Sequence, residues 1–262
     1  MLVDSHCHLD LIAGEGDILP VVQRARASDV RTLVSISTRL STFPSLLARV
    51  EPVDDVWCSV GVHPHNAGKE PTDAATLIGL TDHPKVVGVG EAGLDYFYDN
   101  APRPAQAEGF RAHIAAARAT GLPVIVHTRD ADDDTIAILR DETAKGAFPG
   151  VIHCYSTGPA LAEAALEMGL YLGLGGILTF NRSVELRETI ARVPLERLIL
   201  ETDAPYLAPQ PKRGKPNEPA YIPMVADVLA EVKGSDRATI DRVTTDNFFR
   251  LFAKASRPAD AA

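Results

Sequence analysis

Short apolar runs rich in β-branched residues alternate along most of the chain with longer amphipathic stretches, and this alternation restricts the fold more than any other feature. A short apolar run is typical of a buried strand, whereas apolar residues at every third or fourth position indicate a helix with one buried face. We therefore expect strands over residues 2–8, 32–37, 57–63, 86–91, 123–127, 150–154, 171–178 and 197–203. Helical patterns between them include residues 18–28, 105–120, 132–145, 159–168 and 184–193.

Eight such strand–helix units, each about 25 residues long, occupy about residues 1–220. The predicted fold class is therefore α/β, a TIM-like (β/α)8 barrel formed by one domain over residues 1–262. A doubly wound open sheet is the alternative, but it usually has fewer strands and does not explain where the polar residues fall. Two helices over residues 221–252 should complete the outer ring, and residues 253–262 should form a frayed tail.

The composition is that of an ordinary globular chain, since 45% of the 262 residues are hydrophobic and 23% are charged. The formal net charge of −9 argues against a protein that wraps nucleic acid or adheres to an anionic membrane, although it permits a local cationic pocket. The N-terminal residues lack the basic start and apolar run of a secretion signal, and the three cysteines cannot all pair within the chain. We expect a cytoplasmic protein with no membrane association and no obligate protein partner.

Titratable residues stand at the C-terminal ends of several expected strands, which in a parallel barrel open at one mouth. His6 and His8 lie two residues apart in a strand, so their side chains should share a face and could bind the same ion. Burying such groups without partners is costly, whereas four imidazoles and two carboxylates suit two divalent metal ions. The candidate ligands are His6, His8, Glu91, His127, His153 and Asp203.

Other titratable residues near this mouth have less specific signals. Glu201 precedes Asp203 by two residues, so we expect it to support the ligands from a deeper layer rather than bind an ion. His63 and His65 flank Pro64, and they should either contact substrate or support the ligands, or else belong to a structural turn. His83 and His113 are expected to be exposed to solvent.

Two glycine-rich stretches resemble nucleotide-binding motifs without meeting their requirements. Residues 88–93 read Gly-Val-Gly-Glu-Ala-Gly, but the dinucleotide motif needs a helix to begin within the glycines, and residues 94–102 predict a loop. We expect these glycines to let the backbone pack closely around Glu91. Residues 173–176 lack the Lys-Ser/Thr pair of a phosphate loop, so a closely packed strand in the barrel wall is expected there.

Cationic residues near the predicted mouth are few in this acidic chain. Arg129 follows His127 by two residues and should point into the same opening. Lys212, Arg213 and Lys215 lie in a proline-rich loop after the last strand. Because guanidinium and ammonium groups bind phosphate oxygens, this loop is a candidate phosphate clamp, the alternative being a solvated loop without a ligand.

Seven short motifs are distributed along nearly the whole chain. They are Asp-Ser-His-Cys-His-Leu-Asp at 4–10, Gly-Val-His-Pro-His at 61–65, Gly-Glu-Ala-Gly-Leu-Asp-Tyr at 90–96, Val-His-Thr-Arg-Asp-Ala at 126–131, Glu-Thr-Asp-Ala-Pro-Tyr at 201–206, Arg-Gly-Lys-Pro-Asn-Glu-Pro-Ala-Tyr at 213–221 and Thr-Asp-Asn-Phe at 245–248. In this order the chain resembles the TatD family of metal-dependent deoxyribonucleases, within the amidohydrolase-like barrel superfamily. One local departure is Gly158, which comes one residue later after Tyr155 than the family often has it.

The resemblance implies a TIM-like barrel with divalent metals that hydrolyses phosphodiesters, including 3′-to-5′ exonuclease activity in some members. By matching position, it implies that His6 and His8 bind one metal and His127 and His153 the other. It further implies that Glu91 lies between the two metals. Asp203 then completes the first site and faces the attacking water.

The expected chemistry is metal-assisted hydrolysis, in which Asp203 and Glu91 are the catalytic residues and Asp203 accepts the proton of the water. Two divalent cations, Zn, Mn, Ni or Mg, are the expected cofactors, and single-stranded nucleic acid or another phosphodiester is the expected substrate. Arg129, Lys212, Arg213 and Lys215, with His63 and His65, are the candidate phosphate contacts. A hydrolase of the same fold acting on an amide, ester or lactone would use the same ligands and is the main alternative. A non-catalytic metal-binding barrel is a further alternative, but Glu91 and Asp203 argue against it, because a structural zinc site is usually closed by four Cys or His ligands.

Overall fold

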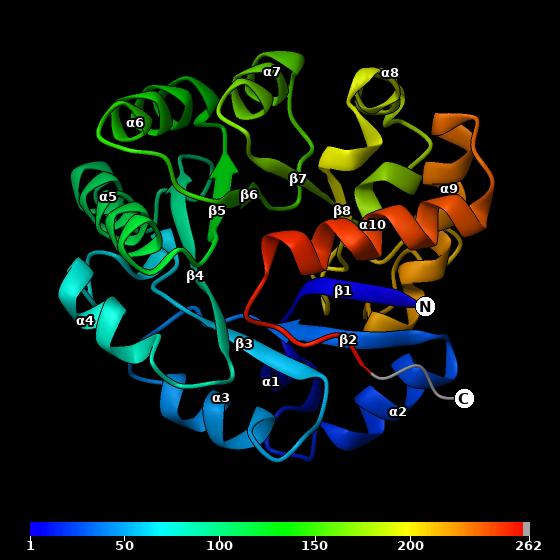
Figure 1. Cartoon of the computed structure of the whole chain (residues 1–262), viewed down its shortest axis with the longest axis horizontal. Coiled ribbons are helices and arrows are strands. Elements are labelled where there is room, and N and C mark those ends of the chain that lie inside the picture. The colour runs from blue at the N-terminus through cyan, green and yellow to red at the C-terminus, as the bar shows by residue number, and fades with distance from the viewer. Residues whose placement is uncertain (259–262) are drawn as a thin grey trace.

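Eight parallel strands form a single sheet in the computed structural model, which describes residues 1–258, and their spatial order follows the sequence from β1 to β8. Figure 1 shows the strands around a central axis with helices outside them. The ends of the sheet meet where the His8 backbone N–H donates to the Ala204 carbonyl at 2.8 Å and the Asp203 N–H donates to the His6 carbonyl at 2.8 Å. The strands are β1 (Leu2–Cys7), β2 (Val30–Ser35), β3 (Val56–Val60), β4 (Val86–Asp95), β5 (Val124–Arg129), β6 (Gly150–Ile152), β7 (Tyr171–Leu174) and β8 (Leu198–Leu200).

Helices cover the outside of this barrel, so the predicted (β/α)8 fold is confirmed. The helices are α1 (Leu9–Ala13), α2 (Leu19–Ala27), α3 (Phe43–Val50), α4 (Ala74–Leu80), α5 (Arg103–Thr120), α6 (Asp132–Ala144), α7 (Pro159–Glu167), α8 (Val184–Arg192), α9 (Ile222–Lys233) and α10 (Arg237–Leu251), with 3₁₀ turns η1 (Pro64–Asn66), η2 (Gly176–Thr179), η3 (Leu195–Arg197) and η4 (Pro219–Tyr221). Each helix pattern that the sequence analysis identified corresponds to one of them. Helices α9 and α10 are the two expected over residues 221–252.

The last helix closes the end of the barrel away from the polar residues. Phe248 and Phe252, on α10 and just beyond it, pack in one buried cluster with Val3, Val87 and Ile125. Each of these strand residues precedes the polar residue of its own strand, so the cluster lies toward the N-terminal ends of the strands. The barrel therefore has an apolar closed end and a polar open end.

Several local expectations are wrong. The final strand ends at Leu200 rather than residue 203, because the chain leaves regular strand geometry and Asp203 adopts a φ of +57°. His113 is fully buried rather than exposed, since its Nε2 accepts from the Val62 N–H at 3.0 Å and its Nδ1 lies 2.6 Å from the Gly109 carbonyl. Within the expected frayed tail, Lys254 donates to the carbonyls of Thr81 and His83, just after α4, and Ala255 is buried, while residues 259–262 lie outside the described part of the chain.

The glycines of β4 have the role that the sequence suggested. A Cβ at Gly93, where φ is +145°, would lie 1.9 Å from the His127 carbonyl oxygen, and a Cβ at Gly61 would lie 2.6 Å from the Gly90 backbone. Only glycine therefore permits β4 to approach its neighbours this closely on either side of Glu91. Similarly, a Cβ at Gly173 in β7 would lie 2.3 Å from a Glu201 carboxylate oxygen.

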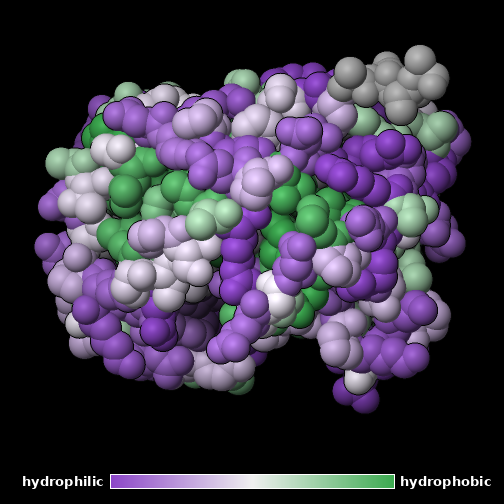
Figure 2. All heavy atoms as spheres, turned by 90° about the horizontal axis from the view of Figure 1, so that it is seen from below, coloured by the Kyte–Doolittle hydropathy of each residue, from purple (hydrophilic) through white to green (hydrophobic). Residues whose placement is uncertain are grey.

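The outer surface is mainly polar. The face shown in Figure 2 is largely hydrophilic, with hydrophobic side chains gathered in two areas between the hydrophilic ones. Within residues 1–258, no helix is long and apolar enough to cross a membrane.

Candidate metal centre

All six candidate ligands meet in one cleft at the C-terminal mouth of the barrel. The cleft has a volume of about 1100 Å³, and its lining includes His8, Glu91, His127, His153 and Asp203. His6 lies just beneath, because it is 1% exposed and its Nε2 is 3.5 Å from a Glu91 oxygen. Residues within or just after β1, β4, β5, β6 and β8 thus form one polar cluster.

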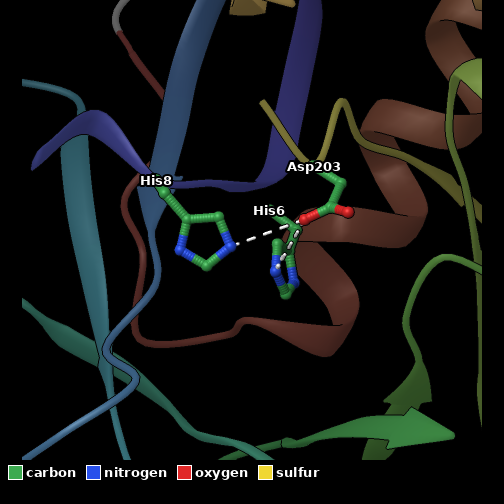
Figure 3. Close-up of side chains that lie close together, drawn as sticks. All are labelled: His6, His8 and Asp203. Atoms are coloured by element: carbon green, nitrogen blue, oxygen red, sulfur yellow. Dashed lines mark ion pairs between the residues drawn. The ribbon is translucent and has the colours of Figure 1, made fainter. Parts of the chain in front are cut away.

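His6, His8 and Asp203 form the first group of possible ligands. The Asp203 Oδ1 atom lies 3.7 Å from His6 Nε2 and 3.4 Å from His8 Nε2 (Figure 3). One ligand atom from each of the three side chains lies within 4.8 Å of the other two, so a single cation could contact all three. This is the grouping that the family resemblance implied for the first metal.

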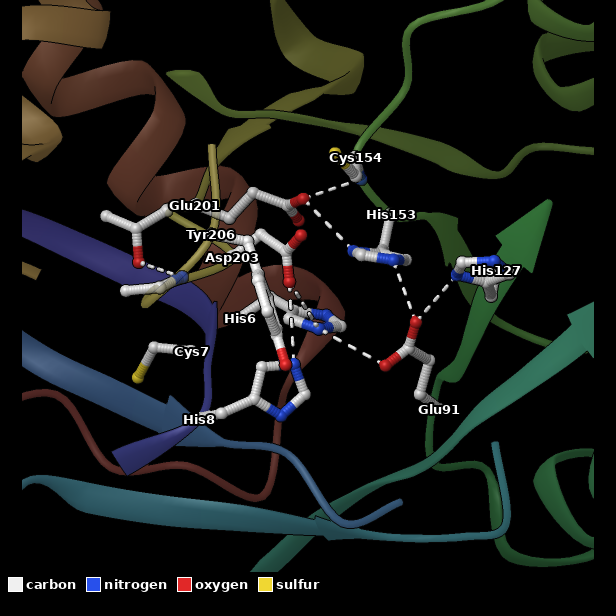
Figure 4. Close-up of polar contacts among 12 residues, drawn as sticks. His6, Cys7, His8, Glu91, His127, His153, Cys154, Glu201, Asp203 and Tyr206 are labelled. Carbon is white, nitrogen blue, oxygen red and sulfur yellow. Dashed lines mark hydrogen bonds and ion pairs between the residues drawn. The ribbon is translucent and has the colours of Figure 1, made fainter. Parts of the chain in front are cut away.

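Glu91 connects this group to His127 in β5 and to His153 just after β6. Its Oε1 lies 2.8 Å from His127 Nδ1 and 2.9 Å from His153 Nε2, while its Oε2 faces His6 (Figure 4). The carboxylate therefore lies between the two groups of histidines, as the resemblance implied. Because its two oxygens face different histidine groups, Glu91 could help either group to hold a divalent cation.

The sequence did not decide whether His63 and His65 contact substrate, support the ligands or form a structural turn. In the structure both line the cleft beside the candidate ligands. His63 Nε2 is 3.5 Å from Glu91 Oε1, and His63 with Glu91 and His127 forms another group close enough to hold one ion. His65 Nε2 is 2.8 Å from Asp95 Oδ2, which also lies 3.1 Å from His127 Nε2. Asp95 thus connects the two histidine-bearing segments.

Asp95 is the residue that the sequence analysis missed, because residues 94–102 were expected to form a loop. In the structure β4 continues through Asp95, and Asp95 is 1% exposed. The available signal was the spacing of four residues from Glu91, since an uninterrupted strand places residues i and i+4 on the same face.

Glu201 supports His153 from below. Its Oε1 lies 3.2 Å from His153 Nδ1 and accepts from the Cys154 backbone N–H at 2.5 Å. A carboxylate bonded to one ring nitrogen orients the imidazole and leaves the other nitrogen available, which here is the Nε2 that faces Glu91. Glu201 also lies near enough to His6 and His153 to belong to a group of possible ligands.

Electrostatics keep the two central carboxylates ionised. Burial raises the pKa of Glu91, but the charges of His153 and His63 and the hydrogen bond with His127 outweigh it and hold the pKa well below its usual value. Burial likewise raises the pKa of Asp203, and the His8 hydrogen bond with the charge of His153 lowers it further than burial raises it. Burial and the nearby His153 lower the pKa of His6. Ionised carboxylates and a neutral imidazole are the forms that bind metal ions.

His6 provides a direct test of whether these residues fit a metal. Neither of its ring nitrogens has a hydrogen-bond partner among the described residues, although the residue is buried. Buried polar groups without partners are rare and costly, and a cation between His6, His8 and Asp203 would satisfy one of them. The donor set of imidazole nitrogens and carboxylate oxygens fits zinc, manganese, nickel or iron.

The cationic lining of the cleft differs from the expected one. Arg129 lines the cleft as predicted, and Arg39 and Lys69, which the sequence analysis missed, line it as well. Both follow strand ends or their adjoining turns, a position that could have identified them. Lys212, Arg213 and Lys215 are outside the described lining of this cleft. The ammonium of Lys212 is instead 5.3 Å from the Tyr221 ring centre, and the guanidinium of Arg213 is 4.0 Å from that of Phe180, because aromatic faces attract these cations.

Comparison with known proteins relates the whole chain to one family. Residues 3–253 match the family model described as TatD related DNase. The uncharacterized metal-dependent hydrolase YcfH of Escherichia coli K12 is 43% identical over 254 residues, covering 96% of this chain and 95% of the relative. The 3′-5′ ssDNA/RNA exonuclease TatD of Edwardsiella piscicida is 38% identical over 249 residues, covering 92% of this chain and 95% of that protein.

A solved structure gives the same result for the fold. The crystal structure of YJJV, a TatD homolog from Escherichia coli K12, superposes with a TM-score of 0.87 at 30% identity and covers 96% of this chain and 98% of that one. Both the sequence match and the superposition therefore span the strands that carry the histidine and carboxylate cluster. This chain belongs to the TatD family of metal-dependent hydrolases.

Proposed function

We propose that this protein is a two-metal phosphodiesterase that removes nucleotides from the 3′ end of single-stranded DNA or RNA. The observation that carries the proposal is the composition of the cleft, where Arg39, Lys69 and Arg129 surround the histidine and carboxylate cluster. An anionic substrate would be attracted to this opening despite the net charge of −9, because its cations and any bound metal are local. The Edwardsiella piscicida relative with a nuclease name supports this choice of substrate.

The residues divide into metal-holding and substrate-holding groups. His6, His8 and Asp203 would hold one ion, His127 and His153 the other, and Glu91 both. Divalent cations in such a cluster make bound water more acidic and neutralise the charge that develops on the phosphoryl oxygens. Zinc, manganese, nickel and magnesium are the candidates.

Asp203 is the proposed proton acceptor. It is ionised, it lies at the edge of the cluster, and its side chain is 14% exposed, so a water molecule can reach it from the cleft. Glu91, at 3% exposure, lies deeper and instead keeps the two histidine groups together. Arg129, with Arg39 and Lys69, would hold the phosphates in line with this carboxylate.

An assay with several substrates tests the proposal. Protein reconstituted with each candidate metal should shorten a 5′-labelled single-stranded oligonucleotide step by step, and EDTA should stop the reaction. Elemental analysis of the reconstituted protein should approach two metal equivalents, and saturation at one equivalent with full activity would contradict the two-metal site. Hydrolysis of lactones or amides without any cleavage of oligonucleotides would refute the nuclease proposal, and rapid cutting of closed circular strands would refute its polarity.

A further inference from the structure

Two exposed aromatic residues stand together at the edge of the cleft. Phe97 is 55% exposed and Tyr98 is 54% exposed, and their ring centres are 4.9 Å apart at an interplanar angle of 89°. Tyr98 also lines the cleft. Large aromatic side chains are usually more buried than this, because leaving their surface in water costs free energy. Their exposure beside a reaction centre therefore suggests a ligand.

Arg129 packs against both rings and also lines the cleft. Its guanidinium carbon lies 4.0 Å from the Phe97 ring centre and 4.8 Å from the Tyr98 ring centre, and the residue is exposed. Within residues 1–258 its guanidinium has no ion pair. The two rings thus hold a cation in place whose N–H groups are not used by the protein itself.

The aromatic pair is tied to the metal-ligand cluster by direct contacts. The Tyr98 backbone N–H donates to Asp95 Oδ1 at 2.9 Å, and the other oxygen of Asp95 contacts His65 and His127. The His65 ring lies 5.3 Å from the Tyr98 ring, nearly perpendicular to it. A group that packs on Tyr98 would therefore lie next to His65, which Asp95 links to His127.

We propose that Tyr98 provides a stacking surface for a nucleobase of a single-stranded substrate, and that Phe97 holds Arg129 in position to bind the phosphate next to that base. This inference rests on the proposed function and identifies what selects its substrate. All bases have a flat π face, so stacking tolerates any sequence, but a base within a duplex is already covered by its neighbours. The surface thus favours unpaired strand ends over duplex DNA and over phosphodiesters without bases.

Equilibrium binding of two matched oligonucleotides tests the stacking role. The first is a fluorescent single-stranded oligothymidylate. The second is the same strand with an abasic unit in place of one nucleotide near the 3′ end, prepared in turn for each position. All proteins carry Asp203→Asn, so that the strand stays intact during the measurement. At one position the abasic unit should weaken binding roughly 5- to 150-fold, the range for loss of one stacked base. Tyr98→Ala should weaken binding of the complete oligonucleotide by a similar factor and remove the difference between the two.

Two further variants separate stacking from other roles of Tyr98. Tyr98→Phe should keep the preference for the base, because it keeps the ring and removes only the hydroxyl. Arg103→Ala is the matched control: its guanidinium lies 3.9 Å from the Tyr96 ring in the same loop but outside the described cleft lining, so it should leave the preference unchanged. A 2-aminopurine at the sensitive position gives a direct signal, since its fluorescence should be quenched on binding to Tyr98 proteins and recover with Tyr98→Ala.

The outcomes distinguish this inference from the proposed function. Equal binding of the complete and abasic oligonucleotides, with normal cleavage by the unmodified protein, overturns the stacking surface and leaves the nuclease intact. A Tyr98→Phe protein that loses the preference as fully as Tyr98→Ala also overturns it, because the hydroxyl would then be responsible. Absence of both binding and cleavage refutes the proposed function itself.

Discussion

The floor and the rim of the cleft are built in different ways. The floor consists of side chains at strand ends, such as His6, Glu91 and His153, which are at most about 5% exposed and contact one another. The rim consists of residues outside the regular strands, such as Arg39, Lys69 and Tyr98, which face the cleft, and Tyr98 contacts the floor through Asp95 and His65. The comparison suggests that the floor determines which chemistry is done and that the rim determines which molecule is held.

Changing Asp203 should have the largest effect on the floor. Asp203→Asn keeps the shape of the side chain but removes a negative charge and the proton acceptor. We expect kcat to fall by roughly 10²–10⁴-fold, the usual scale for loss of a general base, with weaker metal binding as well. Steady-state kinetics at saturating metal measure this. Nearly full activity would show that another group accepts the proton.

His113 supports the floor from outside the cleft, and its effect should depend on pH. Burial lowers its pKa from 6.5 to about 4, only partly opposed by the hydrogen bond with Gly109. As the pH falls, the unfolded chain therefore takes up a proton at His113 at a higher pH than the folded chain does. The contribution of His113 to the free energy of unfolding is fully present above pH about 6.5 and is lost as the pH falls toward 4. By pH about 4 the free energy of unfolding should have fallen by about 3 kcal/mol because of His113.

Urea unfolding between pH 7 and 4.5 measures that dependence. The free energy of unfolding should fall less steeply with decreasing pH in His113→Gln than in the unmodified protein. His83→Gln is the matched control, because His83 is a partly exposed histidine paired with the exposed Glu51. Equal slopes for His113→Gln and the unmodified protein would contradict the burial of a neutral His113.

Glu201 tests whether a residue beneath the floor acts through a ligand. Glu201→Gln keeps the volume but weakens the hold on His153 Nδ1. We expect metal affinity or activity to fall by roughly 10–100-fold, the usual effect of removing a partner that orients a metal-binding histidine. Metal titration gives the affinity without reference to turnover. An unchanged affinity would confine Glu201 to packing.

Single cationic contacts should show the smallest effects, and two arginines can be compared directly, Arg129 in the cleft lining and Arg213 outside it. Arg129→Ala should reduce oligonucleotide affinity several-fold and make its logarithmic salt dependence shallower by about 0.7, as expected when one phosphate contact to a single strand is lost. Arg213→Ala should change neither, because Arg213 lies over Phe180 outside the described cleft lining. Binding at several salt concentrations measures both, and equal losses would return the loop after β8 to the role of a phosphate clamp.

Some features of the fold and of the site could be predicted from the sequence, and others could not. The barrel was predictable because strand and helix periodicities are local, and the clustering of the six candidate ligands was predictable because parallel strand ends must share a mouth. Asp95 was missed because β4 continues beyond the glycines, where the sequence suggests a loop. His113 was misplaced because an amphipathic helix pattern does not show that a ring nitrogen will meet the Val62 N–H.

The sequence by itself determined the repeated strand–helix units, the polar residues at their ends and the family. Only the tertiary structure decided contacts that no motif or strand pattern indicated, such as Asp95 joining His65 to His127. It also decided that Arg39 and Lys69, rather than Lys212 and Arg213, line the cleft. The reason is that side-chain direction along a strand follows a fixed period of two, whereas the course of a loop depends on long-range packing that no local pattern encodes.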